Sequence, residues 1–431
     1  MVFSILIRGV RRSTLTQSDI KVSTPSLLQQ NTLYNMGMKN THLEHLEDEI
    51  LNRGSDGGKD VIDLLQSAGD YLSGKSPDIG ITTKWDGAPA IVCGTDPQTG
   101  KFFVGTKSVF NKTNSKACFN VSDIDRWYTG SLANKLKTCL AYLPQLNITG
   151  IVQGDLLYTD DLGTGKIGGN GVLTFTPNTI TYTVPLGSVL AEQILRARMG
   201  IVFHTRYAGP SIQTAQVAFN SQLSNIKSTD DVFVASANFT DASGVSNFTL
   251  NQIRNYRSLI NRASGSLKQA SSFLDLLGNT GESRFIMAAL FKQFFNKMIR
   301  KGQAVTNTKR VAADFASFFC AKMNEEILSK KSTAAKDKYL QMKDDGLEFI
   351  AANERAIYFT VASYINIRAA KKVIIDQLNK VRTIDTYTKT NRGYTHTNPE
   401  GYVFVSSGSA YKFVDDDFRR ANVTLVKNWD K

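Results

Sequence analysis

Strand-type and helix-type patterns occupy separate parts of this 431-residue chain, which limits the folds that it can adopt. From about residue 250 the apolar period is 3.6, as in helices, and strand-like patterns resume only at Gly401. Before residue 250, alternating apolar residues predict strands over residues 79–84, 89–94, 101–105, 150–155, 172–185 and 200–205. This order predicts an α+β protein in which an all-α segment interrupts a sheet-containing core.

Helical spacing of leucine and isoleucine predicts two helices ahead of the first strand, over residues 40–53 and from about 61 to 74. The segment 347–381 is predicted to form one long helix, or two helices with a break. Residues 163–166 (Gly-Thr-Gly-Lys) are similar to part of a phosphate-binding loop. However, Asp160 and Ile167 stand where that loop requires a glycine and a serine or threonine, so a glycine-rich hairpin is favoured.

Charge and cysteine content restrict the partners and the setting of the protein. The net charge of +13 favours a polyanionic partner, although a merely basic protein, or one that contacts an acidic protein or a membrane surface, fits the charge equally well. The four cysteines lack CxxC spacing, so neither a zinc site nor a disulfide framework is predicted, and a reducing, intracellular setting fits. No apolar run approaches the roughly 18–20 residues that span a bilayer, so no membrane partner is expected.

Residues 1–37 differ in composition from the rest of the chain. The apolar stretch at residues 1–7 is too short for the core of a signal peptide, and no basic region precedes it. Arg8, Arg11 and Arg12 among several Ser and Thr match a transit peptide only weakly. We expect a disordered extension over residues 1–37, of the kind that an upstream start codon adds.

A lysine, two acids and a second lysine follow one another on predicted strands. Lys84 ends the first strand in the sequence Lys-Trp-Asp-Gly, beside a tight Asp-Gly turn. Asp155 lies in the run Val-Gln-Gly-Asp-Leu-Leu, Glu400 opens Glu-Gly-Tyr-Val, and Lys412 follows closely. A lysine that attacks a phosphate must be neutral, so it needs cationic neighbours or burial. Carboxylates that hold a metal ion, and a second cation, would stabilise the charge that develops.

This order of motifs resembles the covalent nucleotidyltransferase superfamily, which contains ATP-dependent DNA and RNA ligases and mRNA capping enzymes. The similarity covers residues of about 40–215 and 390–431. It implies a ligase adenylation-type core of antiparallel sheets with flanking helices, interrupted by the all-α insertion. The RNA-ligase branch is the most similar. Within it the chain looks like divergent ligase-like proteins of large tailed phages, which implies the host cytoplasm as its location.

The resemblance implies a role for each motif residue. Lys84 would be the catalytic nucleophile that forms a lysyl-AMP with ATP, and Lys412 the lysine that binds the phosphate. Asp155 and Glu400 would contact the nucleotide and hold Mg²⁺. The nucleotidyl group would then pass to a 5′-phosphate of a nucleic acid, RNA more than DNA, and a 3′-hydroxyl would displace it.

Further candidates for cofactor binding on the same resemblance are Asp86, Gly87, Lys107 and Phe203. Lys107 follows the strand after the Lys84 motif, near the expected position of the nucleotide sugar, where a solvated strand-end lysine fits equally well. Phe203 lies on the strand expected to correspond to a nucleotide-pocket motif. It would stack on the base there, or it would belong to the core.

The chain departs from the family pattern in several places. Pro89 stands where Arg or Asn is usual, Asp155 replaces the usual Glu, and Lys412 is single instead of one of a Lys-x-Lys pair. The stretch 413–431 is too short for the C-terminal OB domain of capping enzymes and DNA ligases. The short C-terminal stretch counts against one alternative, an RNA guanylyltransferase. Pro89 and the single Lys412 support the other alternative, a non-catalytic nucleic-acid-binding or virion-associated protein that keeps the fold.

The predicted domain limits follow from these motifs. Residues 38–218 would form the first part of the nucleotidyltransferase core, 219–388 the helical insertion, and 389–431 the last motifs. Basic residues accompany an apolar face in the insertion, namely Lys292, Lys297, Arg300, Lys301, Lys309, Arg310, Lys330, Lys331, Lys336 and Lys338. They would either clamp a nucleic-acid backbone or form a solvated helix face.

Overall fold

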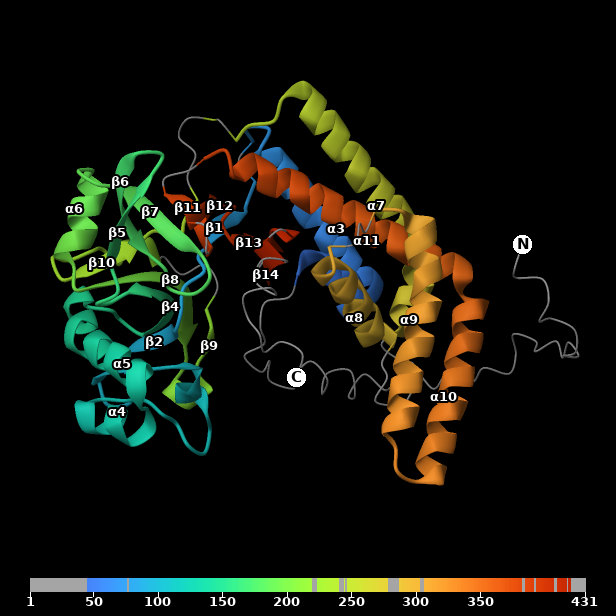
Figure 1. The fold of residues 1–431 in the computed structure, drawn as a ribbon, viewed down its shortest axis with the longest axis horizontal. Coiled ribbons are helices and arrows are strands. Elements are labelled where there is room, and N and C mark those ends of the chain that lie inside the picture. Colours follow the sequence, from blue (N-terminus) through green and yellow to red (C-terminus); the bar gives the residue numbers. More distant parts are fainter. Residues whose placement is uncertain are drawn as a thin grey trace, which may run out of the picture. The chain divides into compact units, whose positions relative to one another are not determined.

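The computed structural model describes residues 45–75, 77–218, 223–239, 244, 246–277, 287–302, 306–381, 384–390, 393–406, 409–416 and 418–419. Helices and mainly antiparallel sheets make up this part of the chain, so the α+β class predicted from the sequence is confirmed (Figure 1). The extension predicted over residues 1–37 lies outside the described residues.

A six-stranded sheet forms the centre of the strand-rich part. It consists of β2 (Ala90–Thr95), β3 (Phe102–Gly105), β4 (Ile151–Tyr158), β8 (Met199–Ala208), β9 (Gln216–Val217) and β10 (Val232–Ala235). The order is β10-β8-β4-β2-β3, with β9 beside β8, and only the pair of β8 and β10 is parallel among these strands. One face of the sheet packs against α4 (Val121–Trp127) and α5 (Gly130–Tyr142) through residues such as Ile91, Val152 and Phe203.

The other face of this sheet packs against a five-stranded sheet. The second sheet has the order β12-β11-β7-β6-β5 and consists of β5 (Gly163–Ile167), β6 (Asn170–Phe175), β7 (Thr181–Pro185), β11 (Asp385–Thr390) and β12 (Gly393–His396). Val202 shares a core with Phe175, Tyr182 and α6 (Val189–Arg196). Gly168 and Gly169 form the turn between β5 and β6 with positive φ, which confirms the predicted glycine-rich hairpin.

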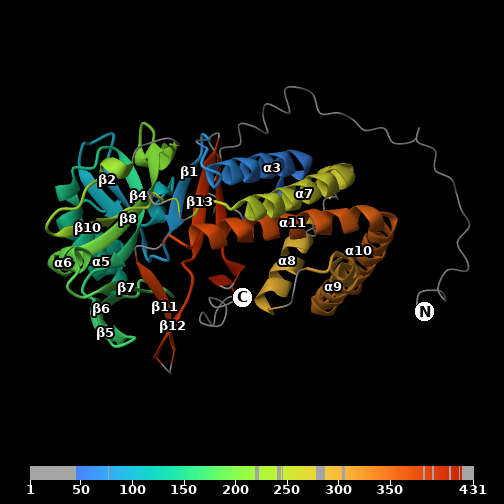
Figure 2. The ribbon, with the colours of Figure 1, turned by 90° about the horizontal axis from the view of Figure 1, so that it is seen from above.

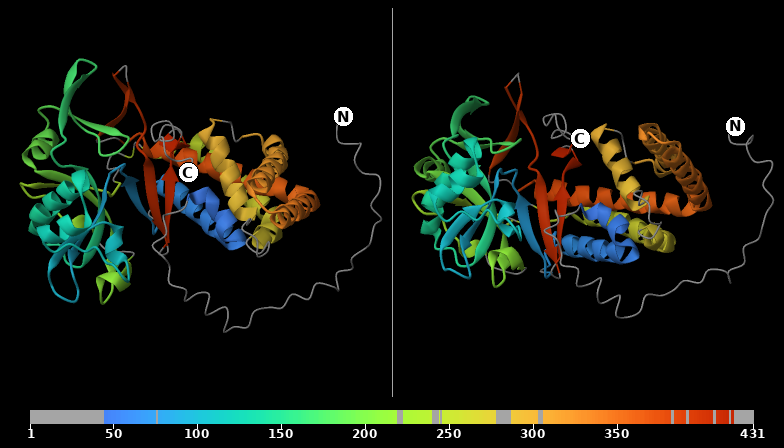
Figure 3. Two further views of the ribbon diagram at one scale, coloured as in Figure 1. Left: turned by 60° about the horizontal axis from the view of Figure 1, so that its bottom comes forward. Right: turned by 90° about the horizontal axis from the view of Figure 1, so that it is seen from below.

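A three-stranded sheet joins the strand-rich part to the helices (Figure 3). β1 (Gly80–Lys84), β13 (Gly401–Ser406) and β14 (Ser409–Val414) are antiparallel in the order β1-β13-β14. Ile81, Phe404 and Phe413 belong to the core of the helices. Because side chains alternate along a strand, the register leaves the other face of this sheet to Lys84 and Lys412.

The helical part consists, in the described residues, of α2 (Glu49–Asn52), α3 (Gly54–Tyr71), α7 (Leu250–Leu277), α8 (Met287–Arg300), α9 (Thr308–Ser329), α10 (Thr333–Ala352) and α11 (Glu354–Leu378). Figure 2 shows α7 beside both α3 and α11. Gly58 and Gly69 of α3 allow this close packing, because a Cβ at either position would lie 2.5 Å from Leu267 or Tyr256 of α7. Short 3₁₀ helices complete the chain at η1 (Leu46–Asp48), η2 (Lys107–Phe110), η3 (Leu143–Leu146), η4 (Ile212–Thr214) and η5 (Leu223–Asn225).

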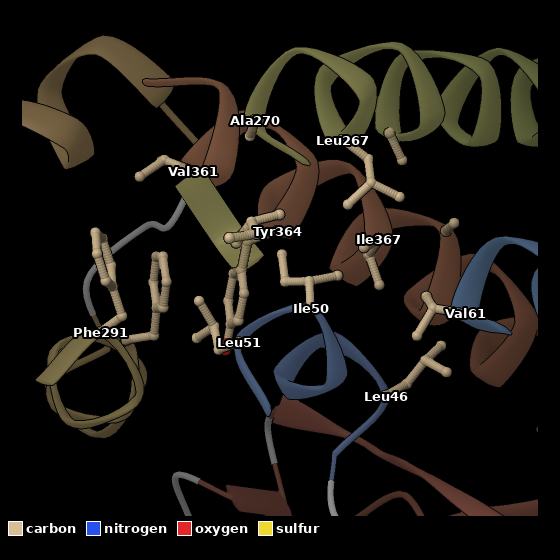
Figure 4. Close-up of a cluster of buried hydrophobic side chains, with 14 of the residues drawn as sticks. Leu46, Ile50, Leu51, Val61, Leu267, Ala270, Phe291, Val361, Tyr364 and Ile367 are labelled. Carbon is tan, nitrogen blue, oxygen red and sulfur yellow. The ribbon is translucent and has the colours of Figure 1, made fainter. Parts of the chain in front are cut away.

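The packing of these helices differs from the domain limits expected from the sequence. Figure 4 shows Leu46, Ile50 and Val61, which precede β1, in one core with Leu267 and Tyr364 of the later helices. The predicted insertion at 219–388 also contains β10 and the start of β11. The helix predicted at 347–381 breaks at Asn353, between α10 and α11. The described residues, from 45 to 419, all belong to one compact unit.

Buried charges tie the N-terminal segment to α11 and to the turn after β14. Lys371 is 1% exposed and donates to both carboxylate oxygens of Glu47, which is fully buried, at 2.6 and 2.7 Å. Arg419 lies 3.3 Å from the same carboxylate, and Arg368 pairs with Asp416. Burial alone would raise the pKa of Glu47, but Lys371 and Arg419 outweigh it and lower that pKa to about 2. Removing only one partner of a pair buried in this way leaves an uncompensated charge and destabilises the fold strongly.

Asp48 gives this cluster a predictable pH dependence. Burial, and then the charge of Glu47, raise the pKa of Asp48 from 3.8 to about 7, against the opposing charges of Arg419, Lys371 and Lys292. Between these two pKa values, the folded protein therefore holds a proton that the unfolded chain releases. The bound proton stabilises the folded state at low pH, and this stabilisation is lost as the pH rises through about 7. As the pH rises from about 5 to about 8, the free energy of unfolding of Asp48→Asn, measured with urea, should increase relative to that of wild type. Asp63→Asn, at an exposed position, is the control. A relative stability of Asp48→Asn that is constant over this range would contradict the expectation.

Candidate active site

Lys84 and Glu400 meet where β1 ends and β13 begins. The strands are antiparallel and Lys84 pairs with Gly401, so the last residue of β1 lies beside the residue before β13. Lys84 Nζ is 2.5 Å from Glu400 Oε2, and the two side chains are 28% and 14% exposed. The backbone N–H of Asp415 donates to the Glu400 carbonyl at 3.1 Å and holds this residue in place. The contact joins residues that are 316 positions apart.

Asp155 lies close to the turn that follows Lys84. A Cβ at Gly87 would be 2.5 Å from the Cβ of Asp155, so only glycine lets the turn approach β4 this closely. The backbone N–H of Ala88 donates to the carbonyl of Leu156 at 3.1 Å and fixes the approach. Gly87 therefore acts by bringing the Lys84 turn against Asp155.

The electrostatics of Glu400 confirm that the charged groups converge. Burial raises the pKa of Glu400, Lys84 opposes this effect, and the negative charges of Asp86 and Asp155 add to it. The carboxylates of Asp86 and Asp155 thus lie near enough to Glu400 for their charges to act on it. An arrangement of this kind favours binding of a further cation, because the carboxylates carry more negative charge than Lys84 neutralises.

Asp86 is a positioning residue and not the nucleotide contact predicted from the sequence. It is 5% exposed, and its carboxylate accepts hydrogen bonds from Asn178 Nδ2 and from the backbone N–H groups of Thr179 and Ile180, at 2.7–2.8 Å. Its own backbone N–H donates to the Tyr182 hydroxyl at 2.7 Å. These bonds fasten the Lys84 turn to the connection between β6 and β7.

Lys412 lies on the same face of the three-stranded sheet as Lys84. Thr82 pairs with Val403, and Val403 pairs with Lys412, so these residues form one row across the sheet. Strand spacings of about 4.8 Å and a rise of about 3.4 Å per residue put the Cα atoms of Lys84 and Lys412 about 12 Å apart. Two lysine side chains can span such a distance towards a shared anion. The segment at His45 also pairs with β14 at Lys412.

Phe203 lies in the core, which is one of the two roles expected for it, and not in the predicted nucleotide site. The side chain is 3% exposed and packs with Ile91 and Ile201 in the core beneath α4 and α5. It therefore cannot stack on a bound base.

Lys107 is exposed at the start of η2, beyond the end of β3, and the described contacts do not connect it with Lys84 or Glu400.

His204 is a site residue that was not predicted from the sequence. Its Nε2 lies 3.4 Å from Asp155 Oδ1, and its Nδ1 is 2.8 Å from the Thr205 hydroxyl. The sequence contained a signal for it, because alternation along β8 turns His204 to the face opposite the apolar Phe203. Tyr182 and Asn178 were not predicted either. The sequence contains no signal for them, because both act only by holding the turn that follows Lys84.

Asp155 and Glu400 are the site residues that suit a divalent cation. Their side chains are 20% and 14% exposed, so both carboxylates reach the surface. No group of three or more His, Cys, Asp or Glu side chains with metal-binding geometry occurs among the described residues. Two carboxylates match Mg²⁺, which completes its coordination with phosphates and water.

Fold and site together define an α+β protein with a lysine–carboxylate cluster where three sheets meet. The chain belongs to a family of unknown function (DUF6267), whose model matches residues 40–427. Searches of curated proteins and of solved structures give no match. Within the described residues, no helix has the length and apolar character needed to cross a membrane.

Proposed function

We propose that the protein is an ATP-dependent nucleotidyltransferase that forms lysyl-AMP at Lys84 and seals nucleic-acid ends, RNA in preference to DNA. The contact between Lys84 and Glu400 is the observation that carries this proposal. A nucleophilic lysine and its carboxylate partner come from opposite ends of the chain. Asp155 on β4 lies against the turn that follows Lys84, and Lys412 lies on β14, which pairs with β13. The resemblance of the motif order to polynucleotide ligases supports the same function.

Glu400 is placed to activate Lys84. The amine must lose a proton before it attacks the α-phosphate, and the Glu400 carboxylate, 2.5 Å away, can accept it. Burial raises the pKa of Glu400, which suits a proton acceptor. The bond from Nζ to phosphorus then forms as the bond to the leaving pyrophosphate breaks, and a second proton leaves the nitrogen with the pyrophosphate.

The remaining residues bind charge and fix geometry. Asp155 and Glu400 would hold Mg²⁺, which supplies positive charge to the phosphates when bound. Lys412 adds a second cation on the face that carries Lys84. Asp86 keeps the Lys84 turn in place through its bonds to Asn178 and the neighbouring backbone, so the amine is oriented before the nucleotide binds.

Covalent labelling tests the proposal. The protein is incubated with Mg²⁺ and either α-labelled ATP or α-labelled GTP, then denatured and separated by electrophoresis. We expect label from ATP on one lysine, and its transfer to a 5′-phosphorylated RNA that is added afterwards. Label from GTP alone would indicate a guanylyltransferase. The absence of label from both nucleotides would favour a non-catalytic nucleic-acid-binding protein.

A further inference from the structure

The solvent face of α7 carries cations and, before Asp275, no acid of its own. Arg254, Arg257, Arg262 and Lys268 are all exposed, and no Asp or Glu occurs between residues 250 and 274. None of the four side chains forms an ion pair in the part of the chain that the structure describes. The other exposed residues of this face are mostly short and polar, namely Asn251, Asn255, Ser258, Asn261, Ser264, Gln269 and Ser272.

The basic residues predicted as a clamp are placed differently. Lys292 donates to Asn52, and Lys297 lies over the ring of Phe318. Between residues 308 and 352, eight basic side chains are interleaved with seven acidic ones. Several of them form ion pairs, such as Arg310 with Asp314 and Lys330 with Glu326. The positive charge of α9 and α10 is therefore largely neutralised by acids on the same helices, whereas that of α7 is not.

The α7 cations are held by a helix that is fixed on its other side. Tyr256, Ala263, Leu267 and Ala270 are buried in the helical core, and Figure 2 shows α7 between α3 and α11. The 14 steps from Arg254 to Lys268 span about 21 Å at 1.5 Å per residue. The cations thus lie along the exposed side of a helix whose other side is held by the core.

We propose that the solvent face of α7 binds the phosphodiester backbone of a nucleic acid. The inference rests on the proposed function, for which it supplies the surface that holds the polynucleotide. Uncompensated cations gain free energy by releasing the counterions of phosphates, and Asn, Ser and Gln side chains donate hydrogen bonds to phosphate oxygens. The large exposed apolar residues of α7, Leu250 and Leu276, lie at its two ends, so the middle of the face suits a polyanion better than a lipid or an apolar protein surface.

A charge-neutral variant of α7 tests this inference. Replacing Arg254, Arg257, Arg262 and Lys268 with Gln keeps residues of good helix propensity. Binding of a fluorescent, 5′-phosphorylated single-stranded RNA is measured by anisotropy from 50 to 200 mM KCl. Loss of four phosphate contacts should lower the salt slope by about 2.8, at about 0.7 per contact. Over this fourfold range of salt, wild type should therefore lose about 50-fold more affinity than the variant.

A matched variant separates a local surface from general basicity. Lys309, Lys331, Lys336 and Lys338 are exposed, and changing them to Gln removes the same charge from α9, α10 and their connection. We expect this control to bind RNA nearly as wild type does. Equal losses in both variants, unchanged binding by the α7 variant, or no RNA binding by wild type would each overturn the inference. Stronger binding of wild type to anionic lipid vesicles than to RNA would overturn it too.

Nucleotide labelling keeps this test distinct from that of the proposed function. Formation of lysyl-AMP needs the site on β1 and β13, so the α7 variant should label as wild type does. Labelling without any loss of RNA binding in the α7 variant would refute the α7 surface alone. RNA binding that depends on α7, in a protein that takes no label, would refute the nucleotidyltransferase and leave the α7 surface in place.

Discussion

Lys84→Ala is expected to abolish covalent labelling by α-labelled ATP, because the variant lacks the amine that forms the phosphoramide bond. Lys84→Arg should fail as well, since a guanidinium stays protonated and does not attack phosphorus. Lys84 is 28% exposed at a strand end, so Lys84→Ala should remain folded, which circular dichroism checks. Lys101→Ala, at an exposed position ahead of β3, is the control and should label as wild type does.

Peptide mapping makes the Lys84 test specific. The label should be found by mass spectrometry on the peptide that contains Lys84. Persistent labelling of Lys84→Ala, or a label on Lys412, would show that the nucleophile is misassigned. Neither result would contradict the fold, because the three-stranded sheet is held by its apolar face and not by Lys84.

Glu400→Gln and Asp155→Ala should each lower the rate of lysyl-AMP formation by roughly 10²–10³, the usual cost of losing one preorganised electrostatic contact. Glu400→Gln keeps the size of the side chain but removes the proton acceptor beside Lys84. The rate is measured in a single turnover with saturating ATP and Mg²⁺. An unchanged rate in Asp155→Ala would show that Asp155 has no part in the reaction.

Asp155→Glu sharpens this prediction because it restores the residue that is usual in the resembling family. We expect it to retain more activity than Asp155→Ala. A loss as complete as that of alanine would mean that the pocket is built around the shorter side chain. The close packing of Gly87 against the Asp155 Cβ gives a physical reason for such an outcome.

The strands of the site could be predicted from the sequence because their apolar residues alternate and are buried. β1, β2, β3 and the start of β4 lie within about two residues of the predicted ranges. β11 and β12 gave no signal, since Asp385–Thr390 and Gly393–His396 are mostly polar strands at one edge of a sheet. The N-terminal helices were predicted as helices. Their place in the core of the insertion follows from long-range packing, which periodicity does not contain.

The order of the motifs assigned Lys84 and Glu400 to one site, but not their direct contact, which follows from the register of β1 and β13. Alternation along a strand shows that Phe203 and His204 face opposite sides, but not which side is covered by helices. The sequence therefore allowed Phe203 as a site residue where the structure has His204. The role of Asp86 depends on a turn about 90 residues further along the chain, at Asn178, and no local pattern reveals that contact.

The contact between Lys84 and Glu400 also sets when the proposed site becomes complete during synthesis of the chain. Ribosomes add roughly 5–20 residues per second. The 316 positions between the two residues then correspond to a delay of roughly 15–60 s after Lys84 has been translated. Through this interval β1 has no β13 to pair with, and its lysine has no carboxylate partner. On the proposed function, a nascent or prematurely terminated chain thus carries Lys84 but not the complete site, and only a chain translated through β13 would react with nucleotide.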